Sequence, residues 1–375
     1  MKALCMKEDD ARYCLALKFI PDVGNVACKN LIDAFGSPVN VFRASHAELS
    51  RVYPITERTA RRIREFSDWS RVDRELSLAD RQGVAIITAQ DNVYPKNLRT
   101  IYDYPPLLYV RGSLSPDEIF LAVVGSRLAS TYGKFITERL CRELALQGIT
   151  IVSGMARGID SAAHRGALAG KGRTIAVLGS GIDVIYPPEN RKLYERIAAQ
   201  GAVITELPFA TEPAGPHFPA RNRIISGMSL GVVVAEATER SGSLITARCA
   251  LDQGREVFAI PGSIDSPGSR GTHALIREGA KLCEDISDIV EEILPQIDVA
   301  PSMKEGRASE AGTAGDPLTA PETTLLDKIG STPLHVDRLI AMTGLKTGDL
   351  LNILLTLELK GYIEQLPGKL FIRKE

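Results

Sequence analysis

Eight short runs of apolar, mostly β-branched residues recur between residues 84 and 263, and they constrain the fold of this chain more than any other feature. They are VAIIT (84–88), LLYVRG (107–112), FLAVVGSR (120–127), ITIVSG (149–154), TIAVLGSG (174–181), AVITEL (202–207), GVVVAEA (231–237) and VFAIPGS (257–263). Because the apolar residues are continuous rather than alternating, the runs predict strands buried on both faces. Helical stretches lie between them, so the sequence predicts an α/β fold with a doubly wound, mostly parallel, Rossmann-like sheet.

Composition divides the 375 residues into four predicted parts. Residues 1–80 have a helical pattern rich in Arg, Ala and Leu, which predicts a small all-α domain. Residues 81–298 hold the predicted sheet, and residues 299–322 lack bulky apolar anchors, which is typical of a flexible linker. Residues 323–375 predict a small winged-helix-like domain. Its third helix, 347–360, is rich in leucine and carries one basic residue, so we expect packing or protein contacts there rather than duplex binding.

The helical part contains a segment, IPDVGNVACKNLIDAFG (20–36), that resembles a helix–hairpin–helix. A second copy, YPITERTARRIREF (53–66), is weaker because Thr56 and Glu57 replace the turn glycine. Such hairpins can bind a DNA phosphate through backbone N–H groups, or they can serve only to pack a small helical domain. We expect the packing role, with phosphate binding as the alternative.

The carboxyl ends of parallel strands meet at one rim of a sheet, where ligands of such folds bind. We expect all the strands to end at that rim, where small residues expose backbone N–H groups to an anion. Arg127 and Arg157 add forked cationic donors suited to phosphate. The rim segments are Gly125-Ser126-Arg127, Ser153-Gly154 with Arg157, Gly179-Ser180-Gly181 and Pro261-Gly262-Ser263. Glycines that serve only tight turns are the alternative. Since neither GxGxxG nor a P-loop occurs, we expect no dinucleotide or other cofactor.

The segment HFPARNRIISGMSLGVVVAEA (217–237) places Arg221 and Arg223 on either side of Asn222, at the expected start of a helix. Two cations at a helix start are unfavourable because the helix dipole is positive there. Such unfavourable residue choices tend to occur at functional sites. Arginines this close suit a backbone carrying successive phosphates, and Phe218 could stack on a base. The alternative is a surface pair that balances nearby glutamates.

A further anion site is expected at Ser241-Gly242-Ser243, which precedes a helix carrying Thr246 and Arg248. Catalytic signals are weak, because no nucleophile motif such as GxSxG occurs. Asp160 and His164 lie four residues apart on one helix face, which we interpret as structural. The six cysteines and five histidines have no metal-ligand spacing, so we expect no metal site.

Charge and hydropathy add limits on location and partners. The net charge is −1, but residues 121–281 hold 19 Lys and Arg against 14 Asp and Glu, which permits a local anion site. No apolar run approaches the roughly 20 residues of a membrane span. Acidic residues stand where a signal peptide needs an apolar core, so we expect a cytoplasmic protein without membrane contacts.

FLAVVGSR, IVSGMARGID, HFPARNRIISGMS, SGSLITA and PGS…GTHALIREGA, in this order, resemble the DNA-processing protein A family, also called DprA or Smf. One departure is His273, where the family usually has Asn. The resemblance implies a non-catalytic homodimer that binds single-stranded DNA, protects incoming DNA and loads the RecA recombinase in natural transformation. The implied DNA-binding residues are Gly125, Ser126, Arg127, Ser153, Gly154, Arg157, Arg221, Asn222, Arg223 and Ser243, with Lys134 and Arg248 as weaker candidates.

Two other functions remain open. Nucleotide phosphoribohydrolases have a similar core with a PGGxGTxxE loop whose Glu is catalytic. The corresponding stretch, ERSGSLITA, has no Glu after its glycine. A purely structural adaptor would leave the arginines of the rim unexplained. A rim carboxylate facing the pocket would favour the enzyme, and the candidates are Asp160, Asp183, Glu206 and Glu236.

Overall fold

The structure of the chain is a computed structural model. It describes residues 2–293 and 296, and after these 320–326, 328–330, 334–343, 350, 353–354, 357, 362–366 and 370–373. The chain divides into two compact units, residues 1–297 and 298–375. The predicted boundary near residue 80 falls inside the first unit and stays a prediction. The predicted linker also stays a prediction, since residues 299–319 lie outside the described residues.

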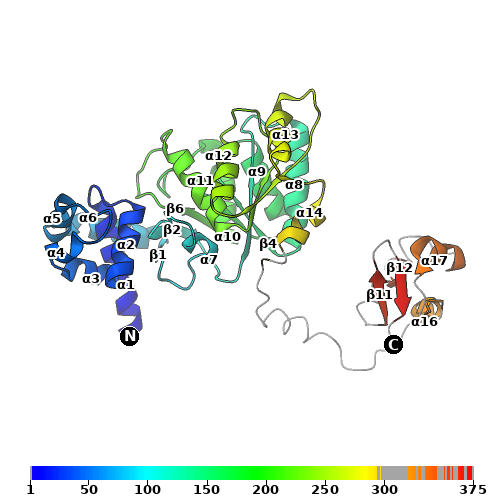
Figure 1. The fold of residues 1–375 in the computed structure, drawn as a ribbon, viewed down its shortest axis with the longest axis horizontal. Helices are drawn as coiled ribbons and strands as arrows, with labels where there is room; N and C mark the ends of the chain where they lie inside the picture. The colour runs from blue at the N-terminus through cyan, green and yellow to red at the C-terminus, as the bar shows by residue number, and fades with distance from the viewer. Residues whose placement is uncertain are drawn as a thin grey trace. The chain divides into compact units, whose positions relative to one another are not determined.

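A nine-stranded sheet forms the centre of the first unit (Figure 1). Its strands stand in the order β1-β2-β6-β5-β4-β3-β7-β8-β9. The bounds are β1 (Ala85–Thr88), β2 (Leu107–Gly112), β3 (Ile119–Val124), β4 (Ile149–Ser153), β5 (Thr174–Val177), β6 (Ala202–Thr205), β7 (Gly231–Val234), β8 (Glu256–Ala259) and β9 (Lys281–Leu282). All eight predicted runs are strands. The doubly wound, mostly parallel α/β sheet is therefore confirmed, and β9 is added.

One strand, β2, corrects the expectation that every strand ends at one rim. β2 pairs antiparallel with β6, and β1 pairs antiparallel with β2, whereas the seven strands from β6 to β9 are parallel. β1 therefore runs in the same direction as β6, and only β2 ends at the opposite edge of the sheet. The apolar run of β2 resembles those of the other strands because helices cover it too, and burial does not reveal direction.

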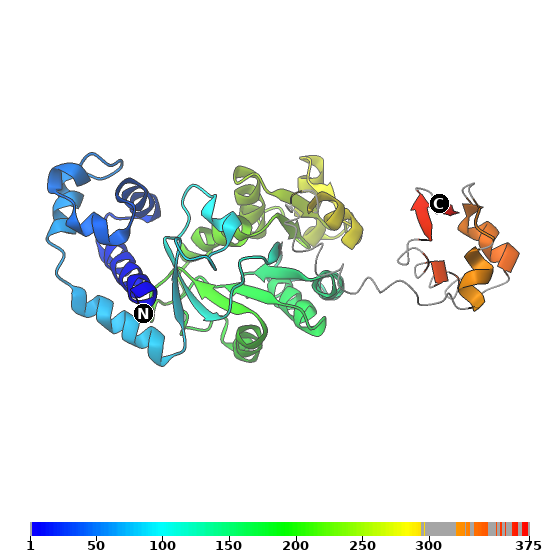
Figure 2. The same cartoon turned by 90° about the horizontal axis from the view of Figure 1, so that it is seen from below.

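Helices cover both faces of the sheet, as the second view shows (Figure 2). On one face, β3 points Ala122 and Val124 into a cluster with α7, α11, α12 and α13. On the other face, Leu121 and Val123 pack against α8, α9 and α14, and α10 covers β5 and β6. The helix bounds are α7 (Lys96–Arg99), α8 (Thr131–Leu146), α9 (Ile159–Ala169), α10 (Arg191–Gln200), α11 (His217–Met228), α12 (Ser243–Asp252), α13 (Arg270–Arg277) and α14 (Ile286–Ile293), with 3₁₀ turns η1 (Pro188–Asn190) and η2 (Pro267–Ser269).

Six helices precede the sheet and pack against the antiparallel edge that β1 and β2 form. They are α1 (Lys2–Phe19), α2 (Asn25–Phe35), α3 (Pro38–Arg43), α4 (His46–Leu49), α5 (Glu57–Arg64) and α6 (Trp69–Arg81). One hydrophobic cluster includes both these helices and β2. Within it, the buried Glu75 carboxylate accepts hydrogen bonds from the Tyr109 hydroxyl and the Phe209 amide, both at 2.8 Å. The helical segment is thus firmly joined to the sheet.

The second unit has a small apolar core of its own. The described elements are α16 (Ala320–Leu326), β10 (Leu334–His335), α17 (Val336–Thr343), β11 (Ile363–Leu366) and β12 (Leu370–Arg373), with the strands in the order β10-β12-β11. Of the expected helix 347–360, only Leu350, Ile353, Leu354 and Leu357 are described. All four are helical, and the three leucines are buried, so they contribute to packing.

Candidate functional site

A cavity at the rim lies between β3 and β7, the two strands where the winding of the sheet reverses. From β3 the chain continues to β4 on one side, and from β7 it continues to β8 on the other. Ligands of doubly wound sheets bind at such a point. The cavity measures about 740 Å³, and we call it the rim pocket. Its side chains include Ser126, Arg127, Asp160, Phe218, Arg221, Asn222, Glu236, Thr238, Ser241, Ser243, Ile245 and Thr246.

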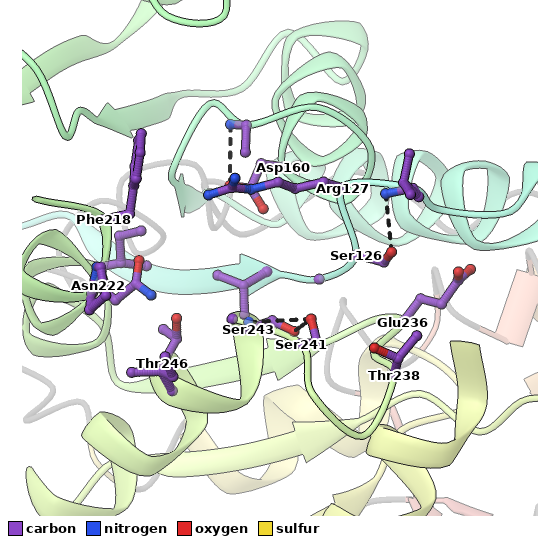
Figure 3. A pocket seen from close by; sticks show the side chains of 18 of the residues that line it. Ser126, Arg127, Asp160, Phe218, Asn222, Glu236, Thr238, Ser241, Ser243 and Thr246 are labelled. Carbon is purple, nitrogen blue, oxygen red and sulfur yellow. Dashed lines mark hydrogen bonds between the residues drawn. The ribbon is translucent and has the colours of Figure 1, made fainter. Parts of the chain in front are cut away.

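Each side of the rim pocket has a distinct chemical character (Figure 3). Arg127 and Asp160 lie on one side and face Ser241, Ser243 and Thr246 across the cavity. Phe218 and Asn222 of α11 close one end, and Glu236 lies at the other. A cation, several hydroxyls and an aromatic ring thus face one another around the same space.

Arg127 and Phe218 form the contact that best suits a nucleotide chain. The Arg127 guanidinium lies 5.1 Å from the centre of the Phe218 ring. The centres of the Phe218 and Tyr186 rings are 5.9 Å apart. Both rings line a second cavity of about 290 Å³, which shares Arg127 and Phe218 with the rim pocket. A cation beside two aromatic rings that line a cavity offers one group for a phosphate and another for a base.

The start of α12 supplies hydroxyl groups and the positive end of a helix dipole. The hydroxyls of Ser241 and Ser243 are 2.7 Å apart, and both residues line the rim pocket together with Thr246. The preceding Gly242 has no side chain to screen this end of the helix. An anion is favoured at such a position by the helix dipole and by the hydroxyl donors.

Two of the four candidate carboxylates do line the rim pocket, namely Asp160 and Glu236. The Asp160 carboxylate accepts a hydrogen bond from the Ala156 amide at 3.3 Å, and burial raises its pKa although Arg221 lowers it. The Glu236 carboxylate accepts from the Ser130 amide and from the Ser130 hydroxyl at 2.7 Å. Both carboxylates therefore bind the loops that surround the cavity.

The other two candidate carboxylates are occupied away from the rim pocket. Asp183 accepts from the Ala210 amide at 2.9 Å. Glu206 forms an ion pair with Arg223 at 2.6 Å. Neither is among the residues that line the rim pocket.

Arg221 contributes to the wall of the rim pocket as a buried structural group. Its Nη1 donates to the Gly154 carbonyl at 2.8 Å and to the Val177 carbonyl. These bonds join α11 to the ends of β4 and β5. Burial lowers the pKa of Arg221 to about 10, with Asp160 opposing the shift, so the group stays charged at neutral pH. A Cβ on Gly154 would lie 2.5 Å from Arg221 Nη2, which explains the need for glycine there.

His164 lies in the core behind this wall, which agrees with its interpretation as structural. Its Nδ1 is 2.7 Å from the Thr174 hydroxyl, which itself donates to the Ile151 carbonyl. Its Nε2 finds no hydrogen-bond partner among the residues described. Burial, with Arg221 and Arg165 adding repulsion, lowers the pKa of His164 to about 3.

The depressed pKa of His164 predicts that acid destabilises the protein. The unfolded chain binds a proton near the ordinary pKa of about 6.5, whereas the folded chain does not until about pH 3. Stability is therefore complete above pH 6.5 and falls below it, by about 2 kcal/mol between pH 7 and 5. Urea unfolding of His164→Asn at both pH values should lack this loss. Identical pH profiles for the variant and the wild type would contradict the assignment.

The predicted site residues fall into two groups. Those that line the rim pocket or the adjoining cavity are Gly125, Ser126, Arg127, Gly154, Arg157, Arg221, Asn222 and Ser243. Lys134 and Arg248 are exposed on α8 and α12, but they line neither cavity. Ser153 is buried at the end of β4, where its hydroxyl donates to the Val123 carbonyl at 2.6 Å.

Arg223 is the clearest correction to the expected site. Its guanidinium forms ion pairs with Glu206 at 2.6 Å and Asp103 at 3.2 Å, and its side chain is only 12% exposed. Residues two apart on a helix project about 200° from each other, so Arg221 and Arg223 leave α11 on different sides. The expected position at a helix start is also wrong, since α11 begins at His217 and Arg221 lies one turn inside.

The expected backbone contacts also need correction. The Ser126 amide donates to the Glu236 carbonyl at 2.7 Å, and the Gly154 amide binds the Asp160 carboxylate. These donors hold the loops together. His273, the departure from the family pattern, lies with Nε2 3.1 Å from the Gly262 carbonyl, so it connects α13 to the loop after β8.

Sequence reasoning missed Tyr186, and it named Glu236 only as a candidate rim carboxylate. Glu236 follows β7 at the reversal point, so the strand-end rule supports that candidate. Tyr186 does not directly follow a strand in the sequence, so its sequence context gives no such signal, although it lines a cavity with Gly179 after β5. Among the residues described, no group of three or more His, Cys, Asp or Glu could hold a metal ion. No helix of the described chain has the length and hydropathy needed to cross a membrane.

Comparison with known proteins gives consistent matches. Residues 85–294 match the family described as DNA recombination-mediator protein A, and residues 309–369 match the DprA winged helix domain. Protein Smf of Escherichia coli K12 is 41% identical over 332 residues, which cover 88% of each chain. The crystal structure of DNA processing protein A from Streptococcus pneumoniae is 37% identical, with a TM-score of 0.67 over 75% of this chain and 97% of that one.

A second solved structure gives insights into the unique single-stranded DNA binding mode of DNA processing protein A from Helicobacter pylori. It is 31% identical, with a TM-score of 0.51, and covers 56% of this chain and 96% of its own. The family match includes every residue that lines the rim pocket. The winged-helix family of the C-terminal unit is confirmed as well. The chain belongs to the DNA recombination-mediator protein A family, whose members are called DprA or Smf.

Proposed function

We propose that this protein binds single-stranded DNA in the rim pocket and does not act as an enzyme. The observation that carries the proposal is the placement of the Arg127 guanidinium over Phe218 at a wall shared by two cavities. A phosphate can bind the guanidinium while a base stacks on the ring. A duplex keeps its bases stacked inside, so an unpaired strand fits this arrangement better. The H. pylori relative supports the choice of ligand.

Within the rim pocket, each group has a proposed role. Arg127 binds a phosphate by charge, while the Ser243 and Thr246 hydroxyls at the start of α12 donate to the same backbone. The amide of Asn222, beside Phe218, can bond to a base edge or a sugar. Arg157 lines the second cavity but is paired with Glu189, so DNA must compete with that carboxylate. Since most of these contacts read phosphate and ring faces, sequence preference should be weak.

Fluorescence anisotropy of labelled oligo-dT, titrated across salt, tests the proposal. We expect binding that weakens steeply with salt, because cationic contacts release counterions from the strand. Duplex DNA and mononucleotides should compete poorly. Absence of oligo-dT binding, or competition by duplex at equal strand concentration, would contradict the proposal.

A nucleotide hydrolase remains the second candidate, because the Asp160 and Glu236 carboxylates line the rim pocket. Both accept hydrogen bonds from loop amides, which favours a structural role for each. Chromatography of nucleoside monophosphates after incubation with the protein separates the two candidates. Release of free base, lost in Asp160→Asn or Glu236→Gln, would support the hydrolase. We expect no turnover.

The family resemblance extends the proposal to partners. We propose that the protein acts in the cytoplasm as a homodimer, protects incoming DNA and loads RecA recombinase onto the bound strand in natural transformation and recombination. RecA ATPase activity on a strand coated with single-strand-binding protein should rise when this protein is added, and nuclease digestion of the strand should slow. Light scattering should give the mass of a dimer.

A further inference from the structure

The helical segment before the sheet is built from two copies of one helix–hairpin–helix unit, 32 residues apart. The first copy uses α1, α2 and the turn between them, and the second uses α4, α5 and their turn. Both turns are closed by the same two backbone hydrogen bonds. These are Val23 N to Ile20 O (3.2 Å) and Cys28 N to Gly24 O (2.9 Å), and, 32 residues later, Ile55 N to Val52 O (2.7 Å) and Ala60 N to Thr56 O (2.8 Å).

The two copies hold each other by reciprocal bonds. Asn30 of α2 donates from Nδ2 to the Tyr53 carbonyl in the second turn, at 2.8 Å. Arg62 of α5 donates from Nη1 to the Pro21 carbonyl in the first turn, at 3.4 Å. Both the donors and the acceptors are related by the same spacing of 32 residues. The pair is therefore a repeated unit with approximate two-fold symmetry in its contacts.

The first copy is used inside the molecule. Its Asn25 donates to Glu206, the same carboxylate that pairs with Arg223 of α11, so this turn faces the nine-stranded sheet and its helices. Its Asp22 forms an ion pair with Arg62 of the second copy. The cation of its helix, Lys29, lies 5.2 Å from the centre of the Tyr104 ring. An anionic ligand at this turn would therefore be repelled by the Asp22 carboxylate, and the Asn25 and Lys29 side chains already have partners within the protein.

The second copy faces solvent and is basic. At the positions equivalent to Val26 and Lys29 it has Arg58 and Arg61, both exposed. Within the described part of the chain, neither arginine side chain has an ion-pair or hydrogen-bond partner. They are three residues apart on α5, so they lie on the same side of the helix. Tyr53 in the adjoining turn is 77% exposed, so its ring is open to a ligand.

We propose that the second hairpin, formed by Tyr53, Arg58 and Arg61, is an additional contact site for the backbone of a DNA strand. Two forked cations on one helix face suit consecutive phosphates, and an exposed tyrosine ring can stack on a base. An acidic protein segment would use the arginines but not the ring. The inference rests on the proposed function, because the strand held in the rim pocket is taken to be the one that reaches this hairpin. The inference adds phosphate binding by the second hairpin to the packing role that the sequence predicts for both.

The test compares Arg58→Gln/Arg61→Gln with Arg74→Gln/Arg81→Gln in the full chain. The control arginines are exposed on α6, which packs against α1 and β1, and the charge change is the same. Anisotropy is measured with oligo-dT of graded length. For long strands, we expect the α5 variant to bind about 3- to 10-fold more weakly, with the salt slope reduced by about 1.4, or about 0.7 for each phosphate contact. The control variant and the shortest binding strands should be unaffected.

The outcomes separate this inference from the function on which it rests. If wild-type protein binds long strands and the α5 variant matches it in affinity and salt slope, the second hairpin makes no DNA contact. A defect of the same size at every length would also contradict the inference, since the proposed contact with α5 requires a strand that extends beyond the rim pocket. If the wild type binds no oligo-dT of any length, the proposed function fails first. A Tyr53→Ala variant should reproduce the length dependence without changing the salt slope.

Discussion

Arg127→Ala is expected to weaken the binding of oligo-dT by about 10- to 100-fold and to leave the free energy of unfolding unchanged. The guanidinium is exposed, and its side chain forms no ion pair or hydrogen bond within the described residues. A charge-assisted contact to phosphate is worth about 1.5–3 kcal/mol, and it is present only when DNA is bound. The slope of log affinity against log salt should also fall by about 0.7.

The matched control for Arg127 is Arg139→Ala on α8, an exposed arginine outside the rim pocket. Anisotropy measures affinity, and urea unfolding measures stability, for both variants. If Arg127→Ala folds normally and binds oligo-dT as tightly as wild type and Arg139→Ala do, Arg127 is not a phosphate ligand. The rim pocket would then lose its only exposed arginine among the residues that line it.

Arg221→Ala should have the opposite profile, with a loss of about 3–5 kcal/mol in the free energy of unfolding. The substitution removes the donor to the Gly154 and Val177 carbonyls and leaves the buried Asp160 carboxylate without its neighbouring cation. Any loss of DNA affinity should follow from the weakened wall of the rim pocket. The free energy of unfolding of Arg221→Lys should fall between those of wild type and Arg221→Ala, because an ammonium cannot reproduce the planar fork of the guanidinium.

Urea unfolding of Arg221→Ala, Arg221→Lys and wild type tests this assignment. Mutating Arg127 should thus change mainly the affinity for DNA, whereas mutating Arg221 on the same pocket wall should change mainly the stability of the protein. A variant Arg221→Ala that is as stable as wild type but fails to bind oligo-dT would contradict the structural role. It would assign the guanidinium to the ligand, as the sequence alone suggested.

The sheet and its binding edge were accessible from sequence because burial leaves a direct mark. Strands covered on both faces need continuous apolar residues, and small residues must follow them where loops approach closely. This reasoning identified all the strands of the nine-stranded sheet except β9, which has only Lys281 and Leu282. It could not show that β2 runs opposite to the other strands, since strand direction depends on the path of the connections and not on the strand residues.

The arginines show where sequence reasoning about a site stops. Arg221 and Arg223 are close in sequence, yet one joins β4 and β5 and the other binds Glu206 and Asp103. Helical geometry alone separates them by about 200°, and this rule was available from sequence once the helix was correctly placed. The ion-pair partners of Arg223 could not be predicted from the sequence, because Glu206 and Asp103 come from distant segments. The roles of Asp160 and Glu236 likewise depend on tertiary contacts.

Photo-crosslinking tests the central claim, that a single strand lies in the rim pocket, most directly. A short oligo-dT carrying one 5-iodouracil, irradiated with the full chain and mapped by mass spectrometry, should crosslink to Phe218, with Tyr186 as the neighbouring target. Arg127→Ala should reduce the yield, and excess unlabelled oligo-dT should abolish it. Crosslinks confined to residues outside the rim pocket and the adjoining cavity, with Phe218 unmodified, would contradict the account.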